Sequence, residues 1–190
     1  MIPLLEQLLE KEDIFKPFTF EEWVDRMISS GLWTKNIDGT YSAKGNVDLS
    51  NKSLTKLPIR FKEVGGGFDC SDNKLTSLEG APQEVGKDFW CEDNQLTTLE
   101  GAPKEVGGSF WCNSNQLTTL EGAPQEVGRS FFCSRNKLIS LEGAPQEVGR
   151  SFFCSRNKLV TLKGIGIVKG TIYCSDNPVS EEELLKTIGK

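Results

Sequence analysis

The segment FWCEDNQLTTLEGAPKEVGGS, from Phe89 to Ser109, is followed at once by FWCNSNQLTTLEGAPQEVGRS (110–130) and FFCSRNKLISLEGAPQEVGRS (131–151). Each copy begins 21 residues after the one before it. The same frame extends back to a degenerate copy that begins at Val47, and forward to a final partial copy, IYCSDNPVS. A fixed period of this length predicts a solenoid in which each repeat forms one rung and stacks on its neighbours.

Apolar residues recur at fixed positions of the repeat and predict columns of buried side chains. An aromatic or aliphatic residue stands two positions before each cysteine, and residues two apart on a strand share a face, so both should point into the core. Leu75 and Leu78, with their equivalents, add two more columns. The first two columns are Phe68, Phe89, Phe110, Phe131, Phe152 and Ile172, and Cys70, Cys91, Cys112, Cys133, Cys154 and Cys174.

The spacing of the cysteines favours buried thiols over a metal site or a disulfide framework. Zinc and redox motifs pair cysteines a few residues apart, whereas here one cysteine occurs in each rung and the chain has no histidine. Free cysteine behaves as a small hydrophobe. Stacked side chains that point the same way rarely meet the torsion that a disulfide requires. We therefore expect reduced thiols and a cytoplasmic location.

Three other recurring residues predict how each rung turns. An asparagine three residues after each cysteine can both donate to and accept from the backbone of the turn that leaves the strand. The proline of each EGAP segment disfavours helix, so the return side of the rung should be extended or turn-like. A glycine precedes each strand where the chain needs positive φ or close backbone approach. These glycines are Gly65, Gly86, Gly107, Gly128 and Gly149.

A period of 21 residues lies in the range of leucine-rich repeats. We therefore predict a leucine-rich-repeat solenoid with short parallel strands on its concave face and a turn-like or extended convex side. Residues 44–178 would form the solenoid, with about seven rungs. Residues 1–43 would form a helical N-terminal cap with a hairpin lead-in, and 179–190 a short C-terminal capping helix, because an open solenoid end exposes the core.

Local signals support both caps. Thr19 and Glu22 have the spacing of a capping box, with Phe18 and Trp23 as a hydrophobic staple, and Gly31 suits the end of that helix. The pair Asp38-Gly39 favours a hairpin turn. At the other end, Ser180 and Glu183 form a second capping box. The first residues, MIPLLEQLLEKED, have the pattern of an amphipathic helix and lack the features of a secretion signal.

The motif F-x-C-S-x-N-x-L-T-x-L-E-G-A-P-x-E-V-G, with the lead-in DGTYSAKGNVDLSNKSLTKLP, resembles leucine-rich-repeat proteins of tailed bacteriophages and some bacteria. The resemblance covers about residues 36–178 and implies protein–protein recognition, in some members as host takeover or the blocking of host defences. The rungs are also similar to the repeat domain of secreted bacterial ubiquitin-ligase effectors. Those carry a large C-terminal catalytic domain, which the twelve residues after the last repeat here do not match.

The residue between the buried aromatic and the cysteine should point outward from the concave face. In successive rungs it is Asp48, Asp69, Trp90, Trp111, Phe132, Phe153 and Tyr173. An exposed aromatic strip is typical of a binding site. The alternative is that duplicated rungs carry the strip only because cross-strand aromatic pairs stabilise a sheet.

Charges beside the strip predict a polarised face. Early rungs carry Asp69, Asp72, Asp88, Glu92 and Asp93, whereas later rungs carry Arg129, Arg135, Lys137, Arg150, Arg156 and Lys158. The protein-binding site predicted from the sequence consists of the five aromatics with Arg129, Arg135, Arg150 and Arg156. Polarity of this kind favours one orientation of a charged partner, although a merely solvated surface would carry similar charges.

Other functional classes fit less well. No catalytic residues, cofactor or metal site are predicted, because the chain lacks histidine, a phosphate-binding glycine loop and a nucleophile motif. Stacked glutamates on the convex side leave calcium as a minor alternative. The net charge of −5 argues against nucleic acid, although the basic end of the strip keeps a phosphate or nucleic-acid binder open. No apolar run is long enough for a membrane span.

The leading hypothesis is a protein-binding adaptor or inhibitor in the cytoplasm of a bacterium or phage-infected cell. The competing hypothesis is a self-assembling structural protein.

Overall fold

The computed structural model describes residues 19–180 and 182–183, and the chain divides into two compact units, Met1–Trp33 and Thr34–Lys190. In the first unit, helix α2 (Phe20–Ser29) begins with the predicted capping box. The Glu22 N–H donates to Thr19 Oγ1 at 3.2 Å, and the Glu22 carboxylate accepts from the Thr19 N–H at 2.8 Å. Gly31, with φ of 71°, follows the helix as expected. The proposed helix in the first residues and the Phe18 staple lie outside the described residues.

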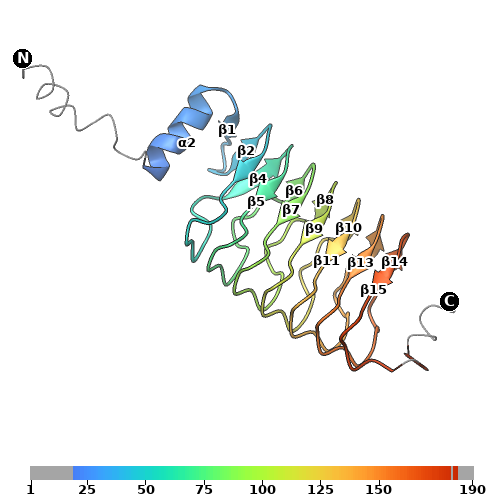
Figure 1. The fold of residues 1–190 in the computed structure, drawn as a ribbon. Helices are drawn as coiled ribbons and strands as arrows, with labels where there is room; N and C mark the ends of the chain where they lie inside the picture. The colour runs from blue at the N-terminus through green and yellow to red at the C-terminus, as the bar shows by residue number, and fades with distance from the viewer. Residues whose placement is uncertain (1–18, 181, 184–190) are drawn as a thin grey trace, which may run out of the picture. The chain divides into compact units, whose positions relative to one another are not determined.

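The second unit is a stack of rungs whose short strands form two sheets with parallel pairing between rungs, spaced by 21 residues and by 20 in the last rung (Figure 1). Sheet B has the strand order β15-β13-β11-β9-β7-β5-β3, and therefore six turns separate its seven strands. Its strands are β3 (Val47–Asp48), β5 (Phe68–Asp69), β7 (Phe89–Trp90), β9 (Phe110–Trp111), β11 (Phe131–Phe132), β13 (Phe152–Phe153) and β15 (Ile172–Tyr173).

Sheet A was not predicted from the sequence. It begins with the hairpin of β1 (Trp33–Lys35) and β2 (Tyr41–Ala43), whose turn contains Asp38-Gly39 as expected, with the Asn36 N–H donating to the Thr40 carbonyl. The return side of the later rungs contains no helix among residues 34–180, but it does contain strands. They are β4 (Phe61–Val64), β6 (Glu84–Val85), β8 (Glu105–Val106), β10 (Glu126–Val127), β12 (Glu147–Val148) and β14 (Ile167–Val168).

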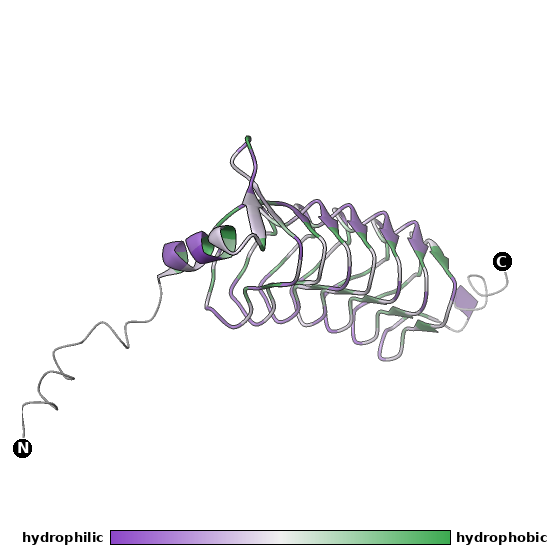
Figure 2. Cartoon of the chain, turned by 90° about the horizontal axis from the view of Figure 1, so that it is seen from above, coloured by the Kyte–Doolittle hydropathy of each residue, from purple (hydrophilic) through white to green (hydrophobic). Residues whose placement is uncertain are grey.

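The predicted core columns are confirmed, except that Ile172 at the end of the first column is only half-buried. The five phenylalanine side chains from Phe68 to Phe152 are fully buried, and neighbouring rings stack with centroids 5.1–5.5 Å apart. Burial of each such side chain stabilises the fold by roughly 2–3 kcal/mol before its entropy cost. The same hydropathy pattern therefore recurs from rung to rung in Figure 2.

The cysteine column is also buried, apart from the half-buried Cys174, and all six cysteines are free. The Cys91 thiol donates to the Trp111 carbonyl of the next rung at 3.2 Å. Burial raises the pKa of this thiol, and of those of Cys70, Cys112 and Cys133, well above the usual value. A thiol that stays protonated in the core is a poor nucleophile and a poor metal ligand.

The asparagine column satisfies the backbone of the turns, as predicted. The Asn115 side-chain amide donates to the carbonyls of Cys91, Cys112 and Asn113 at 3.0–3.3 Å, and its Oδ1 accepts from the Leu96 N–H at 3.0 Å. Each such residue thus ties two rungs together. The other members are Asn73, Asn94, Asn136, Asn157 and Asn177.

Of the two reasons given for the glycines before the strands, close approach is correct. A Cβ on Gly107 would lie 2.5 Å from the Gly86 carbonyl oxygen of the rung before, a distance that no side chain tolerates. Positive φ belongs instead to the glycine of each EGAP segment, for example Gly101 with φ of 87°.

The C-terminal helix predicted from Glu181 to Ile188 lies almost entirely outside the described residues. The part that is described fits the start of a helix, because the Glu183 N–H donates to Ser180 Oγ at 3.3 Å. The Glu183 carboxylate also accepts a hydrogen bond from Thr161 Oγ1 at 2.5 Å.

Candidate functional site

The five predicted aromatic residues form one continuous column on sheet B, which we call the aromatic ladder. The parallel register aligns Trp90 with Trp111, Trp111 with Phe132, Phe132 with Phe153, and Phe153 with Tyr173. All but Tyr173 are half-buried, and Tyr173, at the end of the ladder, is 47% exposed. The alternation of the strand therefore brings the predicted residues together, but with less exposure than a freely projecting strip would have.

Stacking within the ladder decides which part of each ring is accessible. The ring centroids of Trp111 and Phe132 lie 3.6 Å apart, and the next two pairs are each 4.5 Å apart, with interplanar angles of 4–8°. From Trp111 to Tyr173 the neighbouring rings thus cover one another's faces, and this part of the ladder offers a partner mainly ring edges. An aromatic edge carries partial positive charge and favours contact with carboxylate or carbonyl oxygens over stacking with a further flat ring.

Gly67 makes room for the first ring of the ladder. A Cβ at this position would lie 2.7 Å from the Trp90 ring, so the indole covers the backbone of the preceding rung. The sequence contains the signal for this contact, because the equivalent position carries aspartate, serine or threonine in later rungs. The ladder thus begins against Gly67, next to Asp69.

The N-terminal side of the ladder is acidic. Asp69 accepts hydrogen bonds from the Ser71 N–H and hydroxyl at 2.9 and 2.6 Å. Burial, together with the negative charges of Asp69, Asp93 and Asp72, raises the pKa of the nearby Glu92 to about 7. Glu92 Oε2 is buried and has no hydrogen-bond partner among the described residues. An ionised Glu92 is therefore unfavourable in the folded protein.

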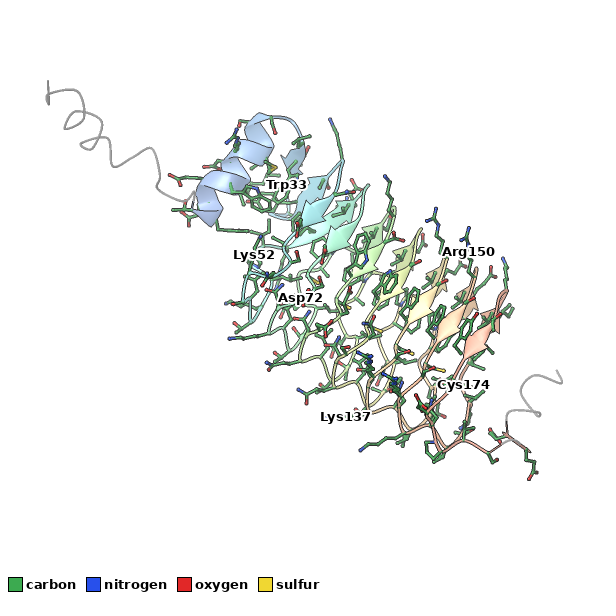
Figure 3. The ribbon with its side chains drawn as sticks, viewed as in Figure 1. Trp33, Lys52, Asp72, Lys137, Arg150 and Cys174 are labelled. Carbon is green, nitrogen blue, oxygen red and sulfur yellow. The ribbon has the colours of Figure 1, made fainter. Side chains whose placement is uncertain are left out.

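The C-terminal side is basic, and its arginines flank the ladder on two sides. Arg129 and Arg150 lie just before strands β11 and β13, whereas Arg135 and Arg156 lie just after them. All four are exposed. Arg156 Nε donates to Asp176 Oδ2 at 3.2 Å, while the other three guanidinium groups have no partner among the described residues. Figure 3 shows Arg150 and Lys137 toward opposite ends of the strands, with Asp72 among the earlier rungs.

The stacked glutamates form two series on the return side of the rungs, one of which is Glu79, Glu100, Glu121 and Glu142 in the EGAP segments. The second series lies in the strands of sheet A. Glu63, Glu84, Glu105, Glu126 and Glu147 are in register along sheet A. Lysines near the C-terminal end form ion pairs with both series, Lys169 with Glu147 at 2.5 Å and Lys163 with Glu142 at 2.7 Å. Within residues 19–180 and 182–183, no group of three or more histidine, cysteine or acidic residues is arranged to hold a metal ion.

No protein-family model matches the sequence, and none of the curated proteins is similar to it. Within the described part of the chain, no helix is long and apolar enough to cross a membrane.

Proposed function

We propose that this chain is a leucine-rich-repeat binding protein that engages another protein on sheet B, the concave face in this reading. The observation that carries the proposal is the half-exposed aromatic ladder flanked by three arginines that have no partner within residues 19–180 and 182–183. Stacked rings on a rigid sheet lose little conformational entropy on binding, and arginine and aromatic residues dominate binding energy at interfaces.

The resemblance to phage and bacterial repeat proteins supports an adaptor or inhibitor role in the cytoplasm of a bacterium or of a phage-infected cell. A non-enzymatic role agrees with the buried, protonated cysteines, which occupy core positions. Recognition of nucleic acid by base stacking fits the ladder less well, because the ring faces are already used within the stack.

The test is affinity capture from source-cell or host-cell lysate with the double variant Phe132→Leu and Phe153→Leu. Leucine keeps most of the apolar volume at these half-buried positions but removes the ring edges, whereas alanine would also weaken the fold. The matched control is Glu105→Gln with Glu126→Gln, which changes exposed residues of sheet A. Circular dichroism melts would establish that both variants fold.

Wild type and the sheet A control should capture the same protein, and the folded leucine variant should lose it. Equal capture by the leucine variant would overturn the proposal, because the partner would then bind elsewhere. Capture of only further copies of the chain, with oligomers in light scattering, would replace it with the self-assembly hypothesis.

A further inference from the structure

The fifth residue of every rung, counted from the buried residue that begins the strand, has a left-handed backbone. The φ angles lie between 51° and 58° in all seven rungs, although none of these residues is glycine. They are Asn51, Asp72, Asp93, Ser114, Arg135, Arg156 and Asp176. The column was not recognised from the sequence, but its asparagine and aspartate residues were the available signal, because these side chains tolerate this conformation best.

The left-handed turn is required by the connection between rungs. At this position the backbone N–H donates to a carbonyl of the next rung, as from Arg135 to Ser155 at 3.0 Å and from Arg156 to Ser175 at 2.9 Å. Arginine is a poor choice for such a turn, since its long side chain gives the backbone no local hydrogen bond in return. Two like charges one rung apart also repel each other. The arginines are thus unfavourable for the fold on two separate grounds.

The Arg156–Asp176 pair shows what a guanidinium at this position can reach. Both residues occupy the left-handed position in adjacent rungs, and Arg156 Nε lies 3.2 Å from the Asp176 carboxylate. For Arg135 the equivalent residue in the next rung is Arg156, so no carboxylate stands at the position that Asp176 occupies relative to Arg156. A carboxylate from a partner would complete the same geometry.

We infer that the two rungs around Phe132 and Phe153 recognise an extended, carboxylate-rich segment of the partner protein, an inference that rests on the proposed function. Arg129 and Arg150 precede strands β11 and β13 and would contact the segment on one side of the ring edges, whereas Arg135, beside the Arg156–Asp176 pair, would contact it on the other. Rungs repeat every ~4.8 Å, and successive side chains of an extended peptide point to opposite sides every ~3.3 Å. A peptide that runs along the ladder therefore presents acidic side chains alternately to the two sides, in bidentate pairs that arginine favours.

The experiment measures binding of a fluorescently labelled hexaglutamate peptide by polarisation, with hexalysine and hexathymidylate as comparison probes. The variant is Arg135→Asn, because asparagine accepts the left-handed backbone while removing the guanidinium. Lys104→Gln, an exposed change on the return side of a rung, is the matched control. Melting temperatures are recorded for all proteins.

Hexaglutamate should bind wild type and the control equally, and Arg135→Asn should lower its affinity about tenfold or more while the melting temperature stays the same or rises. Unchanged affinity in Arg135→Asn, or tighter binding of hexathymidylate than of hexaglutamate, would overturn the inference. If hexaglutamate fails to bind while the leucine variant still loses the captured protein, this inference is wrong and the proposed function stands. A fall in melting temperature in Arg135→Asn would show instead that the arginine serves the fold.

Discussion

Replacing Glu92 with glutamine should make the protein more stable at pH 8 and leave its stability at pH 5 almost unchanged. The Glu92 carboxyl has its ordinary pKa of 4.5 in the unfolded chain, whereas burial and three neighbouring aspartates raise the pKa to about 7 in the folded protein. Between these values the folded state holds the proton more tightly than the unfolded state. The stability of the wild type should therefore fall as pH rises from about 5 to 8.

The magnitude follows from the difference between the two pKa values. One pH unit corresponds to about 1.36 kcal/mol, so a carboxyl whose pKa rises from 4.5 to about 7 would lose about 3 kcal/mol over the full titration. Glu92 is partly exposed, and screening by solvent reduces this to about 1–2 kcal/mol. Glutamine has nearly the same shape and no charge, and it should retain that stability at pH 8.

The assay is urea unfolding of wild type and Glu92→Gln at half-unit steps between pH 5 and pH 8. Glu100→Gln, an exposed change in the same rung, is the control and should give a curve parallel to that of wild type. A difference between Glu92→Gln and wild type that grows by about 1–2 kcal/mol toward pH 8 is the expected result. If the two curves stay parallel, Glu92 is ionised in the folded protein without penalty and its described burial among the aspartates is wrong.

Three further predictions concern the rungs. Asn115→Ala should lower the free energy of unfolding by about 3 kcal/mol in urea titrations, because three carbonyls and one N–H lose their partner. A loss below about 1 kcal/mol would contradict these hydrogen bonds. Gly107→Ala should lower the free energy of unfolding by about 2 kcal/mol or more, since the new methyl group would meet the Gly86 carbonyl oxygen. The control Gly45→Ala, where a Cβ has nothing within 4 Å, should be close to neutral in the same assay. A thiol reagent should modify Cys174 first in the folded protein and the other five cysteines only on unfolding; simultaneous labelling of all six by mass spectrometry would rule out the buried column.

Local chemistry was enough to predict much of the rung. The spacing of Phe110, Cys112 and Leu117 specifies which side chains are buried, because a strand alternates its faces and a repeated unit must stack on copies of itself. Asn115 could be placed at the turn, since few side chains both donate and accept at once. The capping box at Thr19 and the turn at Asp38-Gly39 are equally local, and both are present.

Other features depend on what the neighbouring rung brings close, and only the tertiary structure decided them. Sheet A consists of two-residue strands such as Glu105–Val106, whose pairing depends on alignment with the next rung rather than on their own sequence. The ring faces of the ladder are covered because Phe132 stacks on Trp111, a relation between residues 21 positions apart. The left-handed backbone at Arg135 goes with a hydrogen bond to the next rung, and the high pKa of Glu92 arises from its burial between rungs and from the charges of neighbouring aspartates. The 21-residue sequence repeat identifies which residues form each column. The distances between neighbouring rungs and columns determine the exposure of the rings, the backbone conformation and the pKa values.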